Sequence, residues 1–275
     1  MIAADDRAVV VRPALRRATR ARLIDEIRVF LREPAAVGFT LLFPITLLVI
    51  FGSIFHAKVD GTDVSFSQVY VSGIIGSSLM SVGFVSLAIG VTVEREQGML
   101  KRLAGTPMPK PAYFLAKIGR VLILSLVEIA ILLAIGVVMF DLALPSDLAH
   151  WLTFAWVFVL GASVATLLGL AAGGMIGSAK ASSAILNLPF VALQFISGVF
   201  FPEAQLPSGL RAVASAFPLR WMCKGFRSVF LPDSFLTAEI SGSWQHGVVA
   251  LMLIGWCVIG AVLTARTFRW VGRER

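Results

Sequence analysis

The sequence contains few charged residues and few of the residue types from which catalytic or metal sites are built. Asp, Glu, Lys and Arg make up 15% of the 275 residues and apolar types make up 57%, whereas an average soluble domain has about 25% charged residues. Only three histidines and two cysteines are present, and no HExxH or GxSxG motif occurs. We therefore expect no metal site and no catalytic group, and no disulfide between Cys223 and Cys257.

The phosphate-binding motif GxxxxGK[ST] is also missing. Without this glycine-rich loop the chain cannot hold the phosphates of ATP in the manner of a P-loop protein. If the protein moves a substrate uphill, the energy must come from an ion gradient or from another polypeptide. We expect no cofactor to bind to the chain itself.

Long apolar runs are what the sequence does contain. A helix of about 20 apolar residues crosses a hydrocarbon core of about 30 Å, and these runs lack the alternation of barrel strands. The predicted fold class is an all-α, polytopic membrane protein. Six transmembrane helices are expected, at roughly Val37–Phe55, Val69–Val93, Phe114–Phe140, Trp151–Ile176, Ala184–Phe201 and Gly247–Ala265.

Positive charge is distributed unevenly over the segments that join these spans. With the N-terminus in the cytoplasm, 19 of the 24 lysine and arginine residues fall on the cytoplasmic side. This bias predicts a multi-pass protein of the inner or plasma membrane with both termini in the cytoplasm. Membrane topology then accounts for the net charge of +8, and we expect no nucleic-acid partner.

Two parts of the chain are expected. Residues 1–33 are predicted to form a cytoplasmic tail followed by an amphipathic helix in the membrane interface, and residues 34–275 the six-span domain. From Arg22 to Arg32 the apolar residues share one arc of a helical wheel, and the charged residues, Glu26 among them, lie around the rest. Pro34 should end this helix. The helix is either a topogenic anchor or a lever that contacts a cytoplasmic partner.

Small residues recur at every fourth position of span 4. Because small side chains let membrane helices approach closely, this pattern predicts a tightly packed bundle. The residues concerned are Gly161, Ala165, Gly169, Gly173 and Gly177.

Two features inside the spans could serve transport. Glu128 lies near the middle of span 3, where a carboxylate costs at least ~2.5–3.5 kcal/mol unless it is paired or hydrated. Both a proton-coupling role and a structural role for it stay open. Span 5 carries amide, hydroxyl and aromatic groups on one stripe, which suits either a pathway for amphiphilic molecules or hydrogen bonds between helices. The stripe consists of Ser183, Asn187, Phe190, Gln194, Ser197 and Phe201.

The segment between spans 5 and 6 includes an outer stretch, residues 202–232, that three prolines divide into short amphipathic pieces. It is too short and too charged to cross the membrane twice. We therefore expect an outer re-entrant hairpin that dips into the outer leaflet, with Trp221 and Phe226 in the membrane interface.

A charged stretch separates spans 2 and 3. Its residues 94–105 predict a short amphipathic helix on the cytoplasmic face, which Pro107 brings to an end. Charge concentrated between two spans indicates a surface on which an aqueous partner docks. The helix begins with Glu94, Arg95 and Glu96, carries Met99, Leu100 and Leu103 on its apolar side, and carries Lys101 and Arg102 on another.

Three stretches of the chain carry a family resemblance. They are FLREPAAVGFTLLFPITLLVIFG (Phe30–Gly52), EREQGMLKRLAGTPMPKPAYFLAK (Glu94–Lys117) and ISGVFFPEAQLPSGLRAVASAFPLRW (Ile196–Trp221). At these residues the chain resembles the type-2 ATP-binding-cassette (ABC) permeases, especially their daunorubicin-exporter-like branch. The stretches are similar to the family's interfacial helix and first span, to its coupling helix, and to its fifth span with the outer hairpin.

The resemblance implies a half-transporter. Two six-span subunits, alike or different, would pair, and each would bind a separate nucleotide-binding ATPase subunit that holds ATP and Mg²⁺. The residues from Glu94 to Leu103 would couple that ATPase to the spans, and the outer hairpin would close the pathway. Spans 2 and 5 would flank the pathway, which adds Ser77 and Ser81 to Asn187, Phe190, Gln194 and Phe201 as pathway residues.

The implied function is export of hydrophobic or amphiphilic compounds, such as drugs, antibiotics or lipid-like molecules, by a non-catalytic subunit embedded in membrane lipids. Export of a glycolipid by the same family is an alternative. A different class is a secondary transporter that uses Glu128 and an ion gradient, which predicts activity without an ATPase and its loss in Glu128→Gln. A membrane-embedded enzyme acting on lipids is a third possibility, against which the missing catalytic cluster argues.

Overall fold

The computed structural model describes residues 14–55 and 57–270, so most of the expected N-terminal tail lies outside the described residues. Over this part of the chain the fold is helical, with one isolated antiparallel bridge between Lys58 and Ser65. Its helices are α1 (Leu15–Leu31), α2 (Pro34–Ile54), α3 (Phe66–Met80), the π-helix η1 (Ser81–Ser86), α4 (Leu87–Glu96), α5 (Met99–Ala104), α6 (Lys110–Phe140), α7 (Leu148–Met175), α8 (Ala179–Ile196), the 3₁₀-helix η2 (Glu203–Gln205), α9 (Ser208–Ser215), α10 (Pro218–Phe230), the 3₁₀-helix η3 (Asp233–Thr237) and α11 (His246–Thr267).

The prediction of six spans is confirmed within these residues. Helices long and apolar enough to cross a membrane are α2, the continuous unit α3–η1–α4, α6, α7, α8 and α11. Span 2 starts earlier than expected because Ser65 and Gln68 form a capping box at its first turn. Span 5 ends at Ile196 instead of Phe201, because Gly198 adopts a φ of 77° that takes the chain out of the helix.

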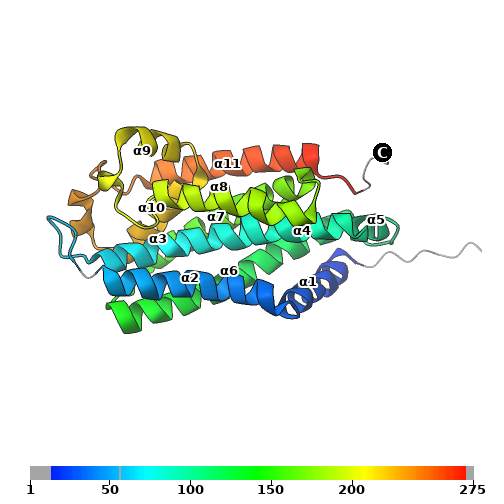
Figure 1. The fold of residues 1–275 in the computed structure, drawn as a ribbon, viewed down its shortest axis with the longest axis horizontal. Helices are drawn as coiled ribbons and strands as arrows, with labels where there is room; N and C mark the ends of the chain where they lie inside the picture. The colour runs from blue at the N-terminus through cyan, green and yellow to red at the C-terminus, as the bar shows by residue number, and fades with distance from the viewer. Residues whose placement is uncertain (1–13, 56, 271–275) are drawn as a thin grey trace, which may run out of the picture.

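The beginning of α1, helix α5 and the end of α11 lie at one end of the bundle, and α9 lies at the other (Figure 1). We call these the α5 end and the α9 end. The segments that the sequence assigns to the cytoplasm thus gather at the α5 end. Because the number of spans is even, the chain enters and leaves the bundle on the same side, in agreement with the positions of α1 and the end of α11.

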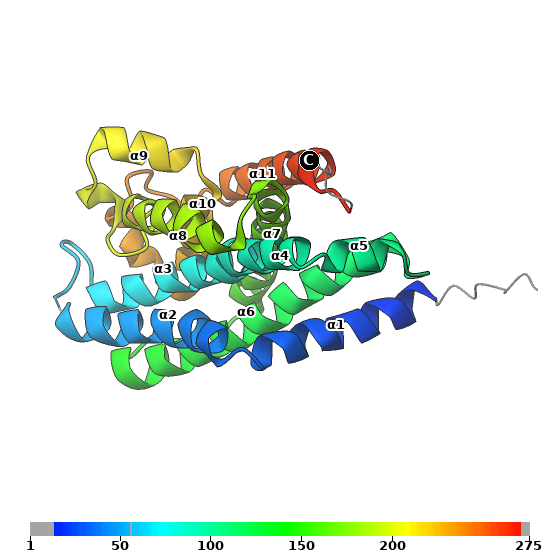
Figure 2. The ribbon, with the colours of Figure 1, turned by 45° about the vertical axis from the view of Figure 1, so that its right-hand side comes forward.

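Span 2 is the central helix of the bundle. Its α3 part packs against α2, α6, α7 and α10, and its α4 part packs against α7 and α8. Figures 1 and 2 show α3 and α4 running lengthwise through the molecule, and Figure 2 shows α1 lying along the first half of α6. Nearly every residue of α3 is buried, hydroxyl side chains included.

Glycines make the contact between spans 2 and 4 close. A Cβ atom added to Gly169 would overlap the carbonyl oxygen of Gly83 in η1, and one added to Gly173 would lie 2.7 Å from Cβ of Val91. The predicted role of the span-4 ladder in helix packing is confirmed at these positions. Its last member, Gly177, lies beyond α7 with open space around it.

The faces predicted for two amphipathic segments are partly wrong. Glu26, expected on the charged side of α1, is 4% exposed, because the residues at four-residue spacing from Ala18 to Phe30 face α6 and its basic side chains. Trp221 and Phe226 of α10 are buried instead of lying at the membrane interface. Helices α3, α7 and α11 cover α10, so its aromatic residues pack inside the protein.

We predict that Gly169→Val strongly destabilises the protein, because the added side chain meets the backbone of η1, which cannot rotate away. Overpacking of this kind typically costs about 1–3 kcal/mol or more. Thermal unfolding of the purified chain in detergent measures the effect. Gly255→Val in α11 is the matched control, since its added side chain enters open space. Equal melting temperatures for the two variants would contradict the packing described here.

Candidate functional site

The charged stretch between spans 2 and 3 consists of the end of α4, a glycine break and the short helix α5. Gly98 has a φ of 71°, a left-handed conformation that other residues adopt only with strain. The single helix predicted over residues 94–105 is therefore two pieces. Glu94 and its neighbours continue span 2, and α5 begins at Met99.

Glu94 lies in a group of charged side chains that α1, α4 and α6 bring together. Its carboxylate accepts hydrogen bonds from Arg22 at 2.8 Å and from Lys117 at 2.7 Å. The Tyr113 hydroxyl donates to its second oxygen at 2.8 Å. Glu26 in turn lies 2.7 Å from both Arg22 and Lys117. We call this group the Glu94 cluster; its members are Arg22, Glu26, Glu94, Tyr113, Lys117 and Arg120.

The Glu94 cluster fixes α1 to the bundle. Lys117 and Glu26 are almost fully buried, and buried ions are tolerated only when opposite charges and hydrogen bonds replace water. Both carboxylates share the same lysine, so separating α1 from α6 would leave uncompensated charges in a dry environment. Glu94 therefore joins three helices inside the protein.

Arg95 and Glu96 connect the end of span 2 to spans 4 and 5. The Arg95 guanidinium donates to the carbonyl of Gly174, close to the C-terminal end of α7. The Glu96 carboxylate accepts from the backbone N–H of Ala179 at 3.0 Å, at the first residue of α8. Each charge has the sign that the adjacent helix dipole favours.

Helix α5 presents a small exposed surface. Leu100 is 2% exposed and belongs to the core, Met99 and Leu103 are half-buried, and Lys101 and Arg102 are exposed. The Met99 sulfur is also 3.7 Å from the guanidinium of Arg22. Of the predicted coupling residues, only Glu96 and the two basic residues of α5 are exposed to solvent.

A cavity of about 410 Å³ lies beside the Glu94 cluster, between α1, α2, span 2, α6 and α8. Its walls combine apolar side chains with the charges of the cluster. Two predicted pathway residues, Ser81 and Asn187, line it. The Asn187 amide donates to the carbonyl and hydroxyl of Ser183 on its own helix, at 2.8 and 3.0 Å.

The other predicted pathway residues lie elsewhere. Ser77, Phe190 and Gln194 are buried in helix contacts. Phe201 lines a second cavity of about 220 Å³ toward the α9 end, together with the aromatic rings of α2, α3 and the turn after α8. Among the described residues, the predicted pathway residues thus line two different cavities, and three of them are buried between helices.

Glu128 is fully buried in α6. Neither carboxylate oxygen has a hydrogen-bond partner of normal geometry in the part of the chain that the structure describes. Over the same residues, no group of three or more histidine, cysteine or acidic side chains could hold a metal ion.

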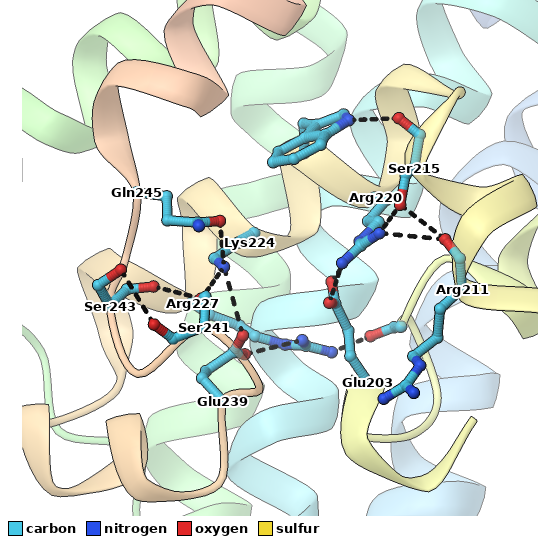
Figure 3. Close-up of polar contacts among 12 residues, drawn as sticks. Glu203, Arg211, Ser215, Arg220, Lys224, Arg227, Glu239, Ser241, Ser243 and Gln245 are labelled. Atoms are coloured by element: carbon cyan, nitrogen blue, oxygen red, sulfur yellow. Dashed lines mark hydrogen bonds and ion pairs between the residues drawn. The ribbon is translucent and has the colours of Figure 1, made fainter. Parts of the chain in front are cut away.

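A second buried ion network lies toward the α9 end (Figure 3). Arg227 donates to the backbone carbonyls of Gly198 and Phe201 after span 5, and lies 3.3 Å from Glu239. Arg220 makes a two-pronged contact with Glu203, at 2.9 and 2.6 Å. We call this group the Arg227 cluster; its members are Glu203, Arg220, Lys224, Arg227 and Glu239.

The Arg227 cluster holds the segment 202–232 against the end of span 5. Burial alone would raise the pKa of Glu203, but the hydrogen bond from Arg220 and the positive charges of Arg227 and Lys224 outweigh it, so the pKa lies below its ordinary 4.5. Burial lowers the pKa of Lys224, although the carboxylate of Glu239 opposes that shift. The network keeps the α8–α10 connection in one conformation.

Sequence reasoning missed most of both clusters. It counted the basic residues only as topology signals and placed Glu26 on a solvated face. Two signals were present: Arg22 and Glu26 lie one turn apart, and Lys117 and Arg120 lie one turn apart inside an otherwise apolar stretch. Charges that enter a span in this way need partners, which a nearby amphipathic helix can supply.

Comparison with known proteins decides the family. The model of the family described as "ABC-2 type transporter" matches residues 17–231, from α1 to the end of α10. The chain belongs to the ABC-2 type transporter family. This permease is similar to "Inner membrane transport permease YadH" of Escherichia coli strain K12, with 24% identity over 82% of this chain and 86% of that one. It is also similar to "Putative transport permease YvfS" of Bacillus subtilis strain 168, with 22% identity over 71% of this chain and 78% of that one.

Membership makes this ABC-2 permease the non-catalytic, multi-pass membrane subunit of a transporter whose ATP is hydrolysed by a partner. The family match begins within α1 and includes the entire Glu94 cluster. Helix α1 is therefore part of the permease domain, as its ion pairs with α4 and α6 also indicate.

We predict that Lys117→Met destabilises the permease by about 3–5 kcal/mol, because two buried carboxylates lose their shared partner. Lys110→Met, at the exposed start of the same helix, is the control. Thermal unfolding in detergent compares the two variants. A Lys117→Met protein as stable as the control would contradict the assignment of the cluster as a structural joint.

A second prediction concerns acid stability. Because the pKa of Glu203 is lower in the folded protein than its ordinary 4.5, the pair with Arg220 stabilises the fold above about pH 4.5 and is lost as the pH falls through the lower folded value. Glu203→Gln should therefore lower the melting temperature at pH 7, and its difference from the wild type should shrink toward pH 3. Asp60→Asn, an exposed carboxylate at the same end, is the control. If the melting temperature of Glu203→Gln lies below that of the wild type by the same amount at every pH, the prediction is contradicted.

Proposed function

We propose that this permease is one half of an exporter that moves hydrophobic or amphiphilic compounds, such as drugs, antibiotics or lipid-like molecules, out of the cell. The observation that carries the proposal is the cavity at the α5 end, whose lining combines apolar side chains with polar and charged ones. Such a lining suits molecules that have both kinds of surface. The α5 end faces the cytoplasm in this proposal, in agreement with the bias of basic residues.

The ATPase subunit, with its ATP and Mg²⁺, docks on α5 in this proposal. Arg102 and Lys101 are exposed there, on a helix whose other side is anchored by Leu100. One turn earlier, Glu94, Arg95 and Glu96 join span 2 to α1, α6, α7 and α8. A displacement of α5 by the ATPase would therefore be transmitted to four neighbouring helices through charged contacts, since no flexible loop lies between α5 and these contacts.

A second permease subunit, identical or related, would complete the pathway. Large apolar side chains of α2 and α8 are exposed in the single chain, among them Phe39, Leu42 and Leu188. Phe39 lines the same cavity as Asn187. A pair of subunits meeting along these helices would enclose the two cavities between them, and the remaining faces would contact membrane lipids.

The resemblance to the daunorubicin-exporter-like branch favours a drug or antibiotic as the substrate, and export of a glycolipid is the alternative within the family. An ion-gradient transporter is less well supported. Its only candidate coupling group, Glu128, has no hydrogen-bond partner among the described residues.

The test is docking and transport with a charge-reversed α5. We predict that Arg102→Glu combined with Leu103→Asp abolishes co-purification of an ATPase subunit with the permease and reduces efflux of an amphiphilic dye from cells by at least about tenfold, since interface charges opposed to a partner cost several kcal/mol. Arg102 is exposed, whereas Leu103 packs against the core, so thermal unfolding of the double variant in detergent is measured beside both readouts.

Lys58→Glu, an exposed charge reversal toward the α9 end, is the control and should leave both readouts unchanged. Transport that persists without an ATPase and is lost in Glu128→Gln would overturn the proposal in favour of a secondary transporter.

A further inference from the structure

Arg120 has the longest polar contacts of the basic residues in the Glu94 cluster. Its two hydrogen-bond contacts, to Glu26 and to the Ser86 hydroxyl, are both 3.5 Å long. Arg22 and Lys117, in contrast, have carboxylate contacts of 2.7 to 2.8 Å. Side-chain hydrogen bonds of charged groups are normally about 2.7–2.9 Å long. Among the described residues, Arg120 thus has donors that no group engages more closely than 3.5 Å.

The charges of the Glu94 cluster also favour an anion beside Arg120. Three basic side chains, Arg22, Lys117 and Arg120, surround two carboxylates, Glu26 and Glu94. Within the cluster one positive charge is therefore left over, and the side chains of the five charged members are 1 to 15% exposed. A buried charge without a counter-charge is costly, and an anion beside Arg120 would remove that cost.

Arg120 is also accessible from the cavity. It lines the 410 Å³ cavity, and its guanidinium lies over the ring of Phe30, 5.2 Å from the ring centre. Next to it the cavity floor is Gly90, where an added Cβ would find only Arg120 Nη1, at 3.6 Å. An anionic group thus has both a donor and room beside it.

The rest of the cavity suits an apolar chain. Val85, Ile89 and Val93 of span 2 form one wall, and Phe39 of α2 lies at the mouth. Phe39 is 59% exposed and stacks on Phe43, so the apolar lining continues to the outer surface of the bundle. The remaining charged residue of the lining, Glu33, is exposed to solvent, which screens it.

We propose that this cavity binds an anionic amphiphile, with its phosphate or carboxylate on Arg120 and its apolar chain along span 2 and Phe39. Basic pockets between membrane helices bind the headgroups of anionic lipids by the same chemistry. The anion could belong to a membrane phospholipid or to a single-chain molecule, and the two share the feature that the cavity recognises. The site lies in the cavity on which the export proposal rests, but anion binding can be measured without an ATPase or transport, so failure of one proposal can be told from failure of the other.

The test measures ligand binding to the full purified chain in neutral detergent, by thermal unfolding and native mass spectrometry. The probes are phosphatidylglycerol, phosphatidylcholine, dodecyl phosphate and inorganic phosphate. We expect phosphatidylglycerol to bind about tenfold more tightly than phosphatidylcholine, the usual gain from a charge-assisted hydrogen bond. Dodecyl phosphate distinguishes a phospholipid from a single-chain ligand. If both dodecyl phosphate and phosphatidylglycerol bind, the site accepts any anionic amphiphile. If phosphatidylglycerol alone binds, the site is specific for phospholipid.

Two variants attack the site in different ways. Arg120→Gln removes the charge. Gly90→Leu fills the space beside Arg120 while every charge remains. If one variant fails to fold, the other still tests the site. Both should lose the preference for the anionic lipid. Arg28 is an exposed arginine of α1 outside the cavity lining. The control Arg28→Gln also removes one positive charge, and it should keep the preference for the anionic lipid.

Three results would overturn the proposal. One is a preference for phosphatidylglycerol that persists in Gly90→Leu and in Arg120→Gln. Another is its equal loss in Arg28→Gln, which would indicate general attraction of anions to a basic surface. The third is equal protection by inorganic phosphate at the same concentration, which would show that the apolar wall contributes nothing.

Discussion

The buried ion pairs among α1, α4 and α6 are the constraint on which the rest of this permease depends. A carboxylate that shares a buried lysine with a second carboxylate can leave only at a large cost, so Lys117 holds Glu26 and Glu94 at fixed positions. Helix α1 is thereby made part of the bundle. The end of span 2 is fixed by the same contacts, and α5 projects from this fixed end after the break at Gly98.

Span 2 connects the Glu94 cluster to the rest of the bundle. It is buried along most of its length and contacts spans 1, 3, 4 and 5 as well as α10. Glycine contacts bring its π-helical part against α7 so closely that little independent sliding is possible. At the far end Arg227 ties α10 to the turn after span 5. The chain therefore has a charged joint at each end and a tightly packed helix between them.

The sequence predicted the helical class, the six spans and close packing along the small-residue ladder of span 4, because apolar length and small-residue spacing are local signals. Which charges are buried was not predictable, since that depends on helices far apart in sequence. Glu26 was placed on a solvated face, although Lys117, 91 residues away, buries it. Trp221 was placed in the lipid interface, although three helices cover α10. The break at Gly98 was missed because a lone glycine in a charged stretch does not by itself disclose a positive φ.

From these contacts we infer that α1, α5 and the start of α6 move as one body when the ATPase drives the transporter. The most direct measurement is a set of electron-spin distances in the permease–ATPase complex, without nucleotide and with ATP trapped. Spin labels at Arg20 of α1, Arg102 of α5 and Lys110 of α6 occupy exposed positions. The account predicts that the three distances within one subunit stay constant while those between the two subunits change. A change in the distance from α1 to α6 on trapping ATP would contradict it.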